Sequence, residues 1–184
     1  MLQLPIPARA DAPPAPIAAA AGAVARCVVR TFVLLGHRAV HLPRANVGRR
    51  ITFGDGSTAR VYRETAVDDA PATARCTLLV CFRLRVIRGR WHRAFEVESL
   101  FNTPLFVGFP GFVSKLWLAH DELDVYRGIY EWDDPELAER YARSLWRVLA
   151  LVCVPGSIHY VVLPGIRRDS LLADPARLAR ITHF

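Results

Sequence analysis

The residues best suited to chemistry lie on one face of a predicted β-hairpin. Alternation along residues 112–120 and 125–132 places basic side chains and one tryptophan on the same side of both strands. Arginines of an earlier strand share that side. Guanidinium and ammonium groups hold carboxylates or enolates, and an indole ring stacks on an aromatic substrate. The pattern therefore predicts a substrate-binding set: Arg83, Arg85, Lys115, Trp117, Arg127 and Glu131.

An ion-pair network between subunits is the alternative for this charged set. If residue 120 pairs with residue 126, Lys115 stands opposite Glu131. Charges so placed cannot face helices without a large desolvation cost, so we expect them to face a cavity or a partner subunit. The side chains on the other face of these two strands are expected to pack beneath the helices as core: Phe112, Leu116, Leu118, Tyr126, Tyr130 and Trp132.

Two histidines are candidates for a catalytic general base. His120 ends a strand beside an acidic turn, and His159 lies on the last predicted strand. Either imidazole would remove a proton if it faced the cavity, and a solvated or core histidine is the alternative. No metal-ligand spacing, Ser-His-Asp grouping or glycine-rich phosphate loop accompanies them. The sequence thus predicts neither a metal nor a cofactor.

A sheet must position these residues, and the pattern from residue 76 onward predicts one. Residues 76–86 read as a strand and residues 91–101 as a helix, followed by the hairpin. A second helix begins at Asp134-Pro135, an Asp cap with Pro at the first helical position, and a final strand spans 157–163. The order β-α-β-β-α-β is the ferredoxin-like α+β plan, with both helices on one sheet face. We expect a second copy of the chain to cover the other face.

The flanking segments are expected to extend this domain with a helix and a β-hairpin before it and an Arg-rich tail after it. The chain then divides into a disordered tail (1–16), a helix and hairpin extension (17–75), the ferredoxin-like domain (76–165) and a C-terminal tail with a short helix (166–184).

The composition of the chain limits the classes of partner that it can bind. The chain is 52% hydrophobic, so apolar surface is buried between subunits or touches a membrane. Its net charge of +7 comes from 23 arginines and one lysine, but these are scattered and no nucleic-acid motif is found. Four cysteines without a CxxC pair indicate buried thiols in a reducing, cytoplasmic setting.

The predicted helix at residues 17–35 has two alternative roles. Arg26 and Arg30 lie on one helical face, which argues against a membrane span. An amphipathic helix that packs on the domain, or makes a peripheral contact with a membrane surface, fits better.

Several of these residues resemble a known family. Pro110-Gly111-Phe112, Lys115, Trp117, then Gly128-Ile129-Tyr130 and the capped helix with Tyr141 resemble the mono-oxygenase-like branch of the dimeric α/β-barrel superfamily, beside the antibiotic-biosynthesis monooxygenases. The resemblance covers roughly residues 76–165. It implies a homodimer whose sheets enclose a ligand cavity, and oxygen chemistry on aromatic substrates without a metal or prosthetic group. That superfamily also contains decarboxylases, isomerases, haem-degrading enzymes and non-enzymatic members.

Two functions follow from these patterns. The first is a cofactor-independent, monooxygenase-like protein that binds a small, aromatic and anionic metabolite. The second is a non-catalytic dimeric module whose basic N-terminal helix docks on a membrane or a partner.

Overall fold

The computed structural model describes residues 12–68, 74–85 and 103–181. Its elements are α1 (Ile17–Gly36), β1 (Val40–His41), β2 (Arg50–Thr52), β3 (Thr58–Val67), β4 (Cys76–Arg83), η1 (Thr103–Leu105), β5 (Phe112–Leu118), β6 (Val125–Trp132), α3 (Pro135–Val152), β7 (His159–Pro164), α4 (Arg168–Ala173) and α5 (Pro175–Leu178).

The strands form one antiparallel sheet in the order β1-β3-β5-β6-β4-β7, with β2 paired to β3. The four strands β5-β6-β4-β7 have the ferredoxin-like order, so the predicted α+β fold class is confirmed. The N-terminal helix and hairpin extension are also present, and β3 adds to the edge of the predicted sheet. The helix predicted at residues 91–101 lies outside the described residues.

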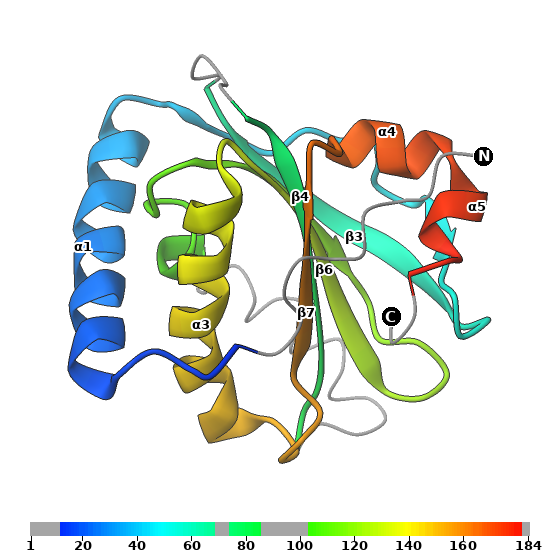
Figure 1. Ribbon diagram of the computed structural model, residues 1–184. Helices are drawn as coiled ribbons and strands as arrows, with labels where there is room; N and C mark the ends of the chain where they lie inside the picture. The colour runs from blue at the N-terminus through cyan, green and yellow to red at the C-terminus, as the bar shows by residue number, and fades with distance from the viewer. Residues whose placement is uncertain (1–11, 69–73, 86–102, 182–184) are drawn as a thin grey trace.

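Helices α1 and α3 lie side by side on one face of the sheet (Figure 1). The Asp134 carboxylate caps α3 by accepting from the backbone N–H groups of Glu136 and Leu137, as the Asp-Pro start predicts. Helix α1 buries a narrow stripe that includes Cys27 and Thr31. Gly108 permits this close contact, because a Cβ there would lie 2.0 Å from the carbonyl oxygen of Cys27.

Part of the segment expected to be disordered is held against α3. The backbone N–H of Ala15 donates to the carbonyl of Arg143, at 3.1 Å. The Arg143 and Arg147 side chains donate in turn to the carbonyls of Pro13 and Ala15, each at 2.8 Å. The expected disorder is therefore wrong for residues 12–16, while residues 1–11 lie outside the described chain.

A bulge in β5 changes the expected register of the hairpin. The pairing shifts between Phe112 and Ser114, so that Lys115 stands opposite Tyr130 and Ser114 opposite Glu131. A one-residue slip moves side chains to the other face of a sheet. Lys115 and Trp117 therefore face the helices. Leu116 and Leu118, which were expected beneath the helices, belong to the core on the opposite face.

That opposite face is covered by the chain itself. Apolar side chains of α4 and α5, together with Ile51 and Phe53 of the N-terminal extension, pack against Leu79 and Ile129 of the sheet. Figure 1 shows α4 and α5 on the side of the sheet away from α1 and α3. The expectation that this face needs a second copy to cover it is therefore wrong, and the predicted C-terminal tail is part of the core.

Buried ion pairs hold these covering segments in place. Arg168 of α4 reaches Glu64 of β3 at 2.8 Å and donates to the Ser114 hydroxyl at 2.9 Å. Arg127 of β6 pairs with the carboxylates of Asp121 and Asp55, the latter at 2.9 Å. Because each pair joins a covering segment or loop to a central strand, the extension and the C-terminal helices are tied to the sheet.

We expect Arg168→Met to lower the free energy of unfolding by about 3–5 kcal/mol, because it leaves the Glu64 carboxylate buried without its cation. Urea denaturation measures the loss. Arg177→Met is the matched control, since the Arg177–Asp174 pair is solvent-exposed and should contribute less than about 1 kcal/mol. Equal losses in the two variants would contradict the assigned role of Arg168.

Candidate functional site

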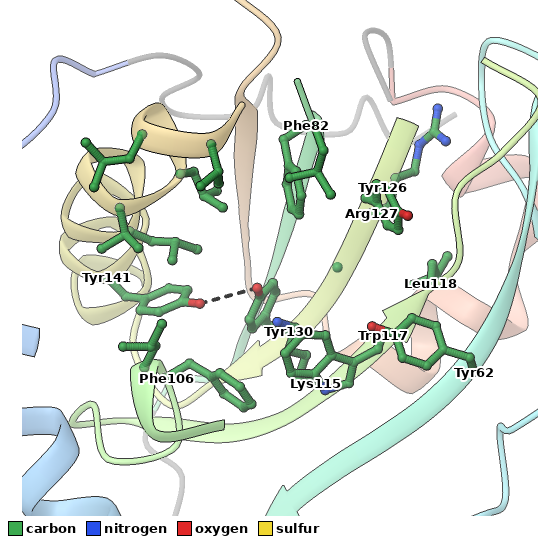
Figure 2. Close-up of a pocket in the computed structure, with 18 of the residues that line it drawn as sticks. Tyr62, Phe82, Phe106, Lys115, Trp117, Leu118, Tyr126, Arg127, Tyr130 and Tyr141 are labelled. Atoms are coloured by element: carbon green, nitrogen blue, oxygen red, sulfur yellow. Dashed lines mark hydrogen bonds between the residues drawn. The ribbon is translucent and has the colours of Figure 1, made fainter. Parts of the chain in front are cut away.

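A cavity of about 580 Å³ lies between the helix-facing side of the sheet and α3. Its wall is mainly aromatic and is assembled from six segments of the chain. Aliphatic side chains of α3 complete it (Figure 2). The aromatic lining includes Tyr62 of β3, Phe106 after η1, Trp117 of β5, Tyr126 and Tyr130 of β6 and Tyr141 of α3. Such a wall suits a flat, apolar ligand.

One amine lies inside this aromatic wall. Lys115 is only 7% exposed, and its Nζ lies 3.1 Å from the ring centroid of Trp117, 4.5 Å from that of Phe106 and 4.7 Å from that of Tyr130. Burial, together with the positive charge of Arg63, holds the pKa of Lys115 well below its usual 10.5. The rings offset part of this cost by cation–π attraction. Burial and Arg63 therefore shift the equilibrium of Lys115 toward the neutral amine.

Trp117 is fixed in position by its neighbours on β3. Its indole N–H donates to the Thr65 hydroxyl at 3.2 Å, and the Arg63 guanidinium carbon lies 3.9 Å from its ring centroid. Burial lowers the pKa of Arg63 to about 10. Trp117 thus contacts the basic side chains of Arg63 and Lys115, and its ring plane is set by hydrogen bonding rather than by packing alone.

Two tyrosines supply hydroxyl groups to the cavity wall. The hydroxyl of Tyr141 donates to that of Tyr130 at 3.3 Å, as the dashed line in Figure 2 marks. Burial raises the pKa of each phenol, so both remain protonated at neutral pH. Gly128 leaves room for this pair, because a Cβ at that position would lie 2.7 Å from the Tyr130 ring.

Two of the predicted site residues come together in the cavity, Lys115 and Trp117. Arg85 also lines it, and its Nε donates to the Cys153 carbonyl at 2.6 Å. The Arg127 guanidinium points away from the cavity and packs on Phe53 across the sheet. Arg127 is also among the residues that line the cavity, but its guanidinium is engaged by the carboxylates of Asp55 and Asp121, so its substrate-binding role stays a prediction.

The other predicted residues lie outside the cavity lining. Arg83 is exposed at the end of β4, and Glu131 faces the opposite side of the sheet, where it pairs with Arg75 at 3.0 Å. His159 stands opposite Cys81, whose side chain belongs to that second core. His120 packs on Tyr126, with ring centroids 5.8 Å apart, without lining the cavity. The parity expected for Glu131 and the base role expected for both histidines therefore do not fit this geometry.

Sequence reasoning missed the contributions of Tyr62, Arg63 and Phe106. Tyr62 and Arg63 come from the N-terminal extension, and Phe106 comes from the segment before the hairpin, for which the sequence predicted no role. The sequence does carry signals for Tyr130 and Tyr141. Strand alternation places Tyr130 on the helix-facing side of the sheet, and helical spacing places Tyr141 on the buried side of its helix.

The cysteines give no reactive or metal-binding group here. All four are buried thiols, and burial raises the pKa of Cys76 and of Cys153 to about 12, so both stay protonated. Within residues 12–68, 74–85 and 103–181, no group of three or more His, Cys, Asp or Glu side chains is arranged to hold a metal ion.

No protein-family model and no curated protein matches this sequence. Among solved structures, an uncharacterised ferredoxin-fold protein from Listeria monocytogenes, related to antibiotic-biosynthesis monooxygenases, is 13% identical with a TM-score of 0.42; the match covers 58% of this chain and 63% of that one. A major regulator of staphylococcal pathogenesis is 11% identical (TM-score 0.39, 71% and 89% covered). An anthrone oxidase-like protein is 13% identical (TM-score 0.34, 61% and 58% covered). At these scores the fold assignment depends on the strand order described above.

The buried amine predicts an unusual pH dependence of stability. Between the folded-state pKa of Lys115 and 10.5, the unfolded chain binds a proton at this residue and the folded chain does not. The free energy of unfolding of the wild type, relative to Lys115→Met, should therefore rise with pH, by up to about 1.4 kcal/mol per pH unit. Urea denaturation of both proteins across the alkaline range measures this difference, and parallel curves would show that Lys115 stays protonated in the fold.

Proposed function

We propose that the cavity binds a small aromatic molecule with an acidic hydroxyl or enol group, and that this molecule is the substrate of a cofactor-independent oxidation by dioxygen. The observation that carries the proposal is the position of Lys115. Its amine is the basic group at the centre of an aromatic cavity, and Arg63, not a carboxylate, is the charged neighbour that acts on it among the described residues.

Proton transfer explains why an acidic ligand fits. A neutral amine takes the proton of a phenol or enol, and the resulting ammonium and oxyanion neutralise one another inside the cavity. The surrounding rings stack on the ligand, and the Tyr130 and Tyr141 hydroxyls supply hydrogen-bond donors in the same wall. The ligand's negative charge thus supplies a counter-ion to Lys115 that no carboxylate acting on it provides within the described residues.

The same transfer activates a carbon acid for oxidation. When Lys115 removes a proton from a methylene group between aromatic rings, the carbanion can pass electrons to dioxygen. Overall, the methylene group and dioxygen give a carbonyl group and water, so the substrate supplies all the electrons. The resemblance to mono-oxygenase-like proteins supports this choice of reaction.

We expect para-nitrophenol to bind as its coloured phenolate at a pH below its solution pKa, because Lys115 accepts the proton. We also expect anthrone, whose central methylene is acidic, to consume dioxygen in the presence of the protein. Lys115→Met should lose both signals, since it removes the base and keeps the apolar volume. Absorbance titration and an oxygen electrode measure the two effects.

Arg83→Met is the control, because Arg83 is exposed outside the cavity and the substitution likewise replaces a long basic side chain with methionine. Phenolate binding that survives in Lys115→Met would overturn the proposed site. Binding without oxygen uptake by any methylene compound would overturn the oxidation and leave a binding protein.

The exposed face of α1 favours a second candidate function, docking on an anionic membrane. Val29 and Phe32 are 66% and 63% exposed, although their helix packs on α3 through its other side. Residues 12–54 contain six arginines and no acidic residue, so two such surfaces would repel each other while anionic lipid would attract them. By length and composition, α1 is also the one described helix able to cross a membrane.

We expect the protein to co-sediment with phosphatidylserine vesicles. The double substitution Val29→Glu and Phe32→Glu should weaken this binding by more than about tenfold, because it removes two apolar side chains that would be buried in the lipid. Leu123→Glu, at another exposed apolar position, is the control. Equal binding to pure phosphatidylcholine, or by the double variant, would contradict docking through α1.

A further inference from the structure

Lys115 is the only lysine among the 24 lysine and arginine residues of the chain. Arginine would bind a carboxylate or phenolate at least as well, because its guanidinium stays charged and can form bidentate hydrogen bonds. Only the lysine amine can lose its proton and form a covalent bond with a ligand. All the other lysine or arginine positions of the chain carry arginine, and the single lysine lies in the cavity wall.

The geometry suits a nucleophile. Strand β5 lies between β3 and β6 in the interior of the sheet, so the backbone of Lys115 is held on both sides. The amine emerges among the rings of Trp117, Phe106 and Tyr130, on the cavity wall (Figure 2). Burial and the nearby Arg63 favour its neutral, nucleophilic form.

We propose that the Nζ of Lys115 forms an imine with an aromatic aldehyde or ketone bound in this cavity. The inference rests on the proposed function, because it requires that the cavity accept an aromatic molecule, and it adds the carbonyl group as the feature that the site recognises.

The reaction balances without an external oxidant or reductant. The nitrogen lone pair attacks the carbonyl carbon, and the carbonyl oxygen gains a proton to give a carbinolamine. Loss of the hydroxyl group with a second proton gives water, while the nitrogen gives up its own protons and a carbon–nitrogen double bond forms. Tyr130 and Tyr141, protonated in the same wall, are the groups suited to donate to the departing oxygen.

Imine formation and proton transfer are alternative uses of one lone pair, because the nitrogen of an imine no longer acts as the free amine base. A carbonyl ligand therefore engages Lys115 through a covalent bond, whereas an acidic ligand engages it through an ion pair.

The probe for this reaction is salicylaldehyde, which carries both the acidic phenol and the carbonyl group. Sodium cyanoborohydride reduces the imine to a stable secondary amine, with a mass increase equal to the aldehyde less one oxygen atom. Intact-mass measurement and peptide mapping then locate the adduct. The chain offers only two amines, the Lys115 side chain and the N-terminal α-amino group, so the assignment is unambiguous.

We expect the adduct on the Lys115 peptide at neutral pH, with a rate at least about tenfold above that of free Nα-acetyl-lysine, because each unit of pKa lowering raises the neutral fraction about tenfold. Lys115→Arg and Lys115→Met should form no adduct beyond that at the N-terminus. Arg83→Met should react like the wild type. Circular dichroism and urea denaturation establish that the variants are folded.

Three results would overturn the inference: modification confined to the N-terminus, a rate equal to that of free lysine, or equal reaction in unfolded protein. Binding of para-nitrophenol separates this failure from that of the proposed function. If the phenolate signal persists while no adduct forms, the imine is wrong and the binding site stands. If both are absent, the cavity does not take aromatic ligands, and both proposals fail.

Discussion

The bulge between Phe112 and Ser114 determines what each face of the sheet contains. Downstream of it, Lys115 and Trp117 turn toward α3, and Ser114 and Leu116 turn toward α4. Without the bulge, the amine would join Glu131 on the other face and form an ordinary buried ion pair. The aromatic cavity would then have no amine in its wall. A single extra residue in one strand thus separates the charged network that holds the fold from the isolated amine of the site.

Both layers of the fold are supplied by one chain. Ion pairs of Glu64, Arg127 and Arg168 join the central strands to the segments that cover the second face, and the cavity lies under α3 on the first. The site therefore differs from a lumen enclosed by the sheets of two subunits, which the family resemblance implied.

The sequence predicted the strand order well because its signals are local. Alternation in β4 and the Asp134-Pro135 start of α3 both need only their immediate neighbours. The site was predicted less well because its composition depends on register. Lys115 and Trp117 were found from residue type, but their face, and the exclusion of Glu131, follow from a bulge that no local pattern marks. Tyr62 and Phe106 reach the cavity through long-range packing, which periodicity cannot reveal.

The solvation of one charge connects the cavity to its function. Burial removes the Lys115 ammonium from bulk solvent and Arg63 adds repulsion, so the pKa of Lys115 is lowered and its equilibrium shifts toward the neutral amine. A neutral, apolar ligand would leave that balance unchanged and gain only contact with the rings. An acidic ligand gives its proton to the amine and becomes the missing counter-ion, and a carbonyl ligand uses the same lone pair to form a bond. Under the proposed function, the cavity selects a ligand first by its acidic or carbonyl group, which reacts with the Lys115 amine, and second by its fit to the aromatic wall.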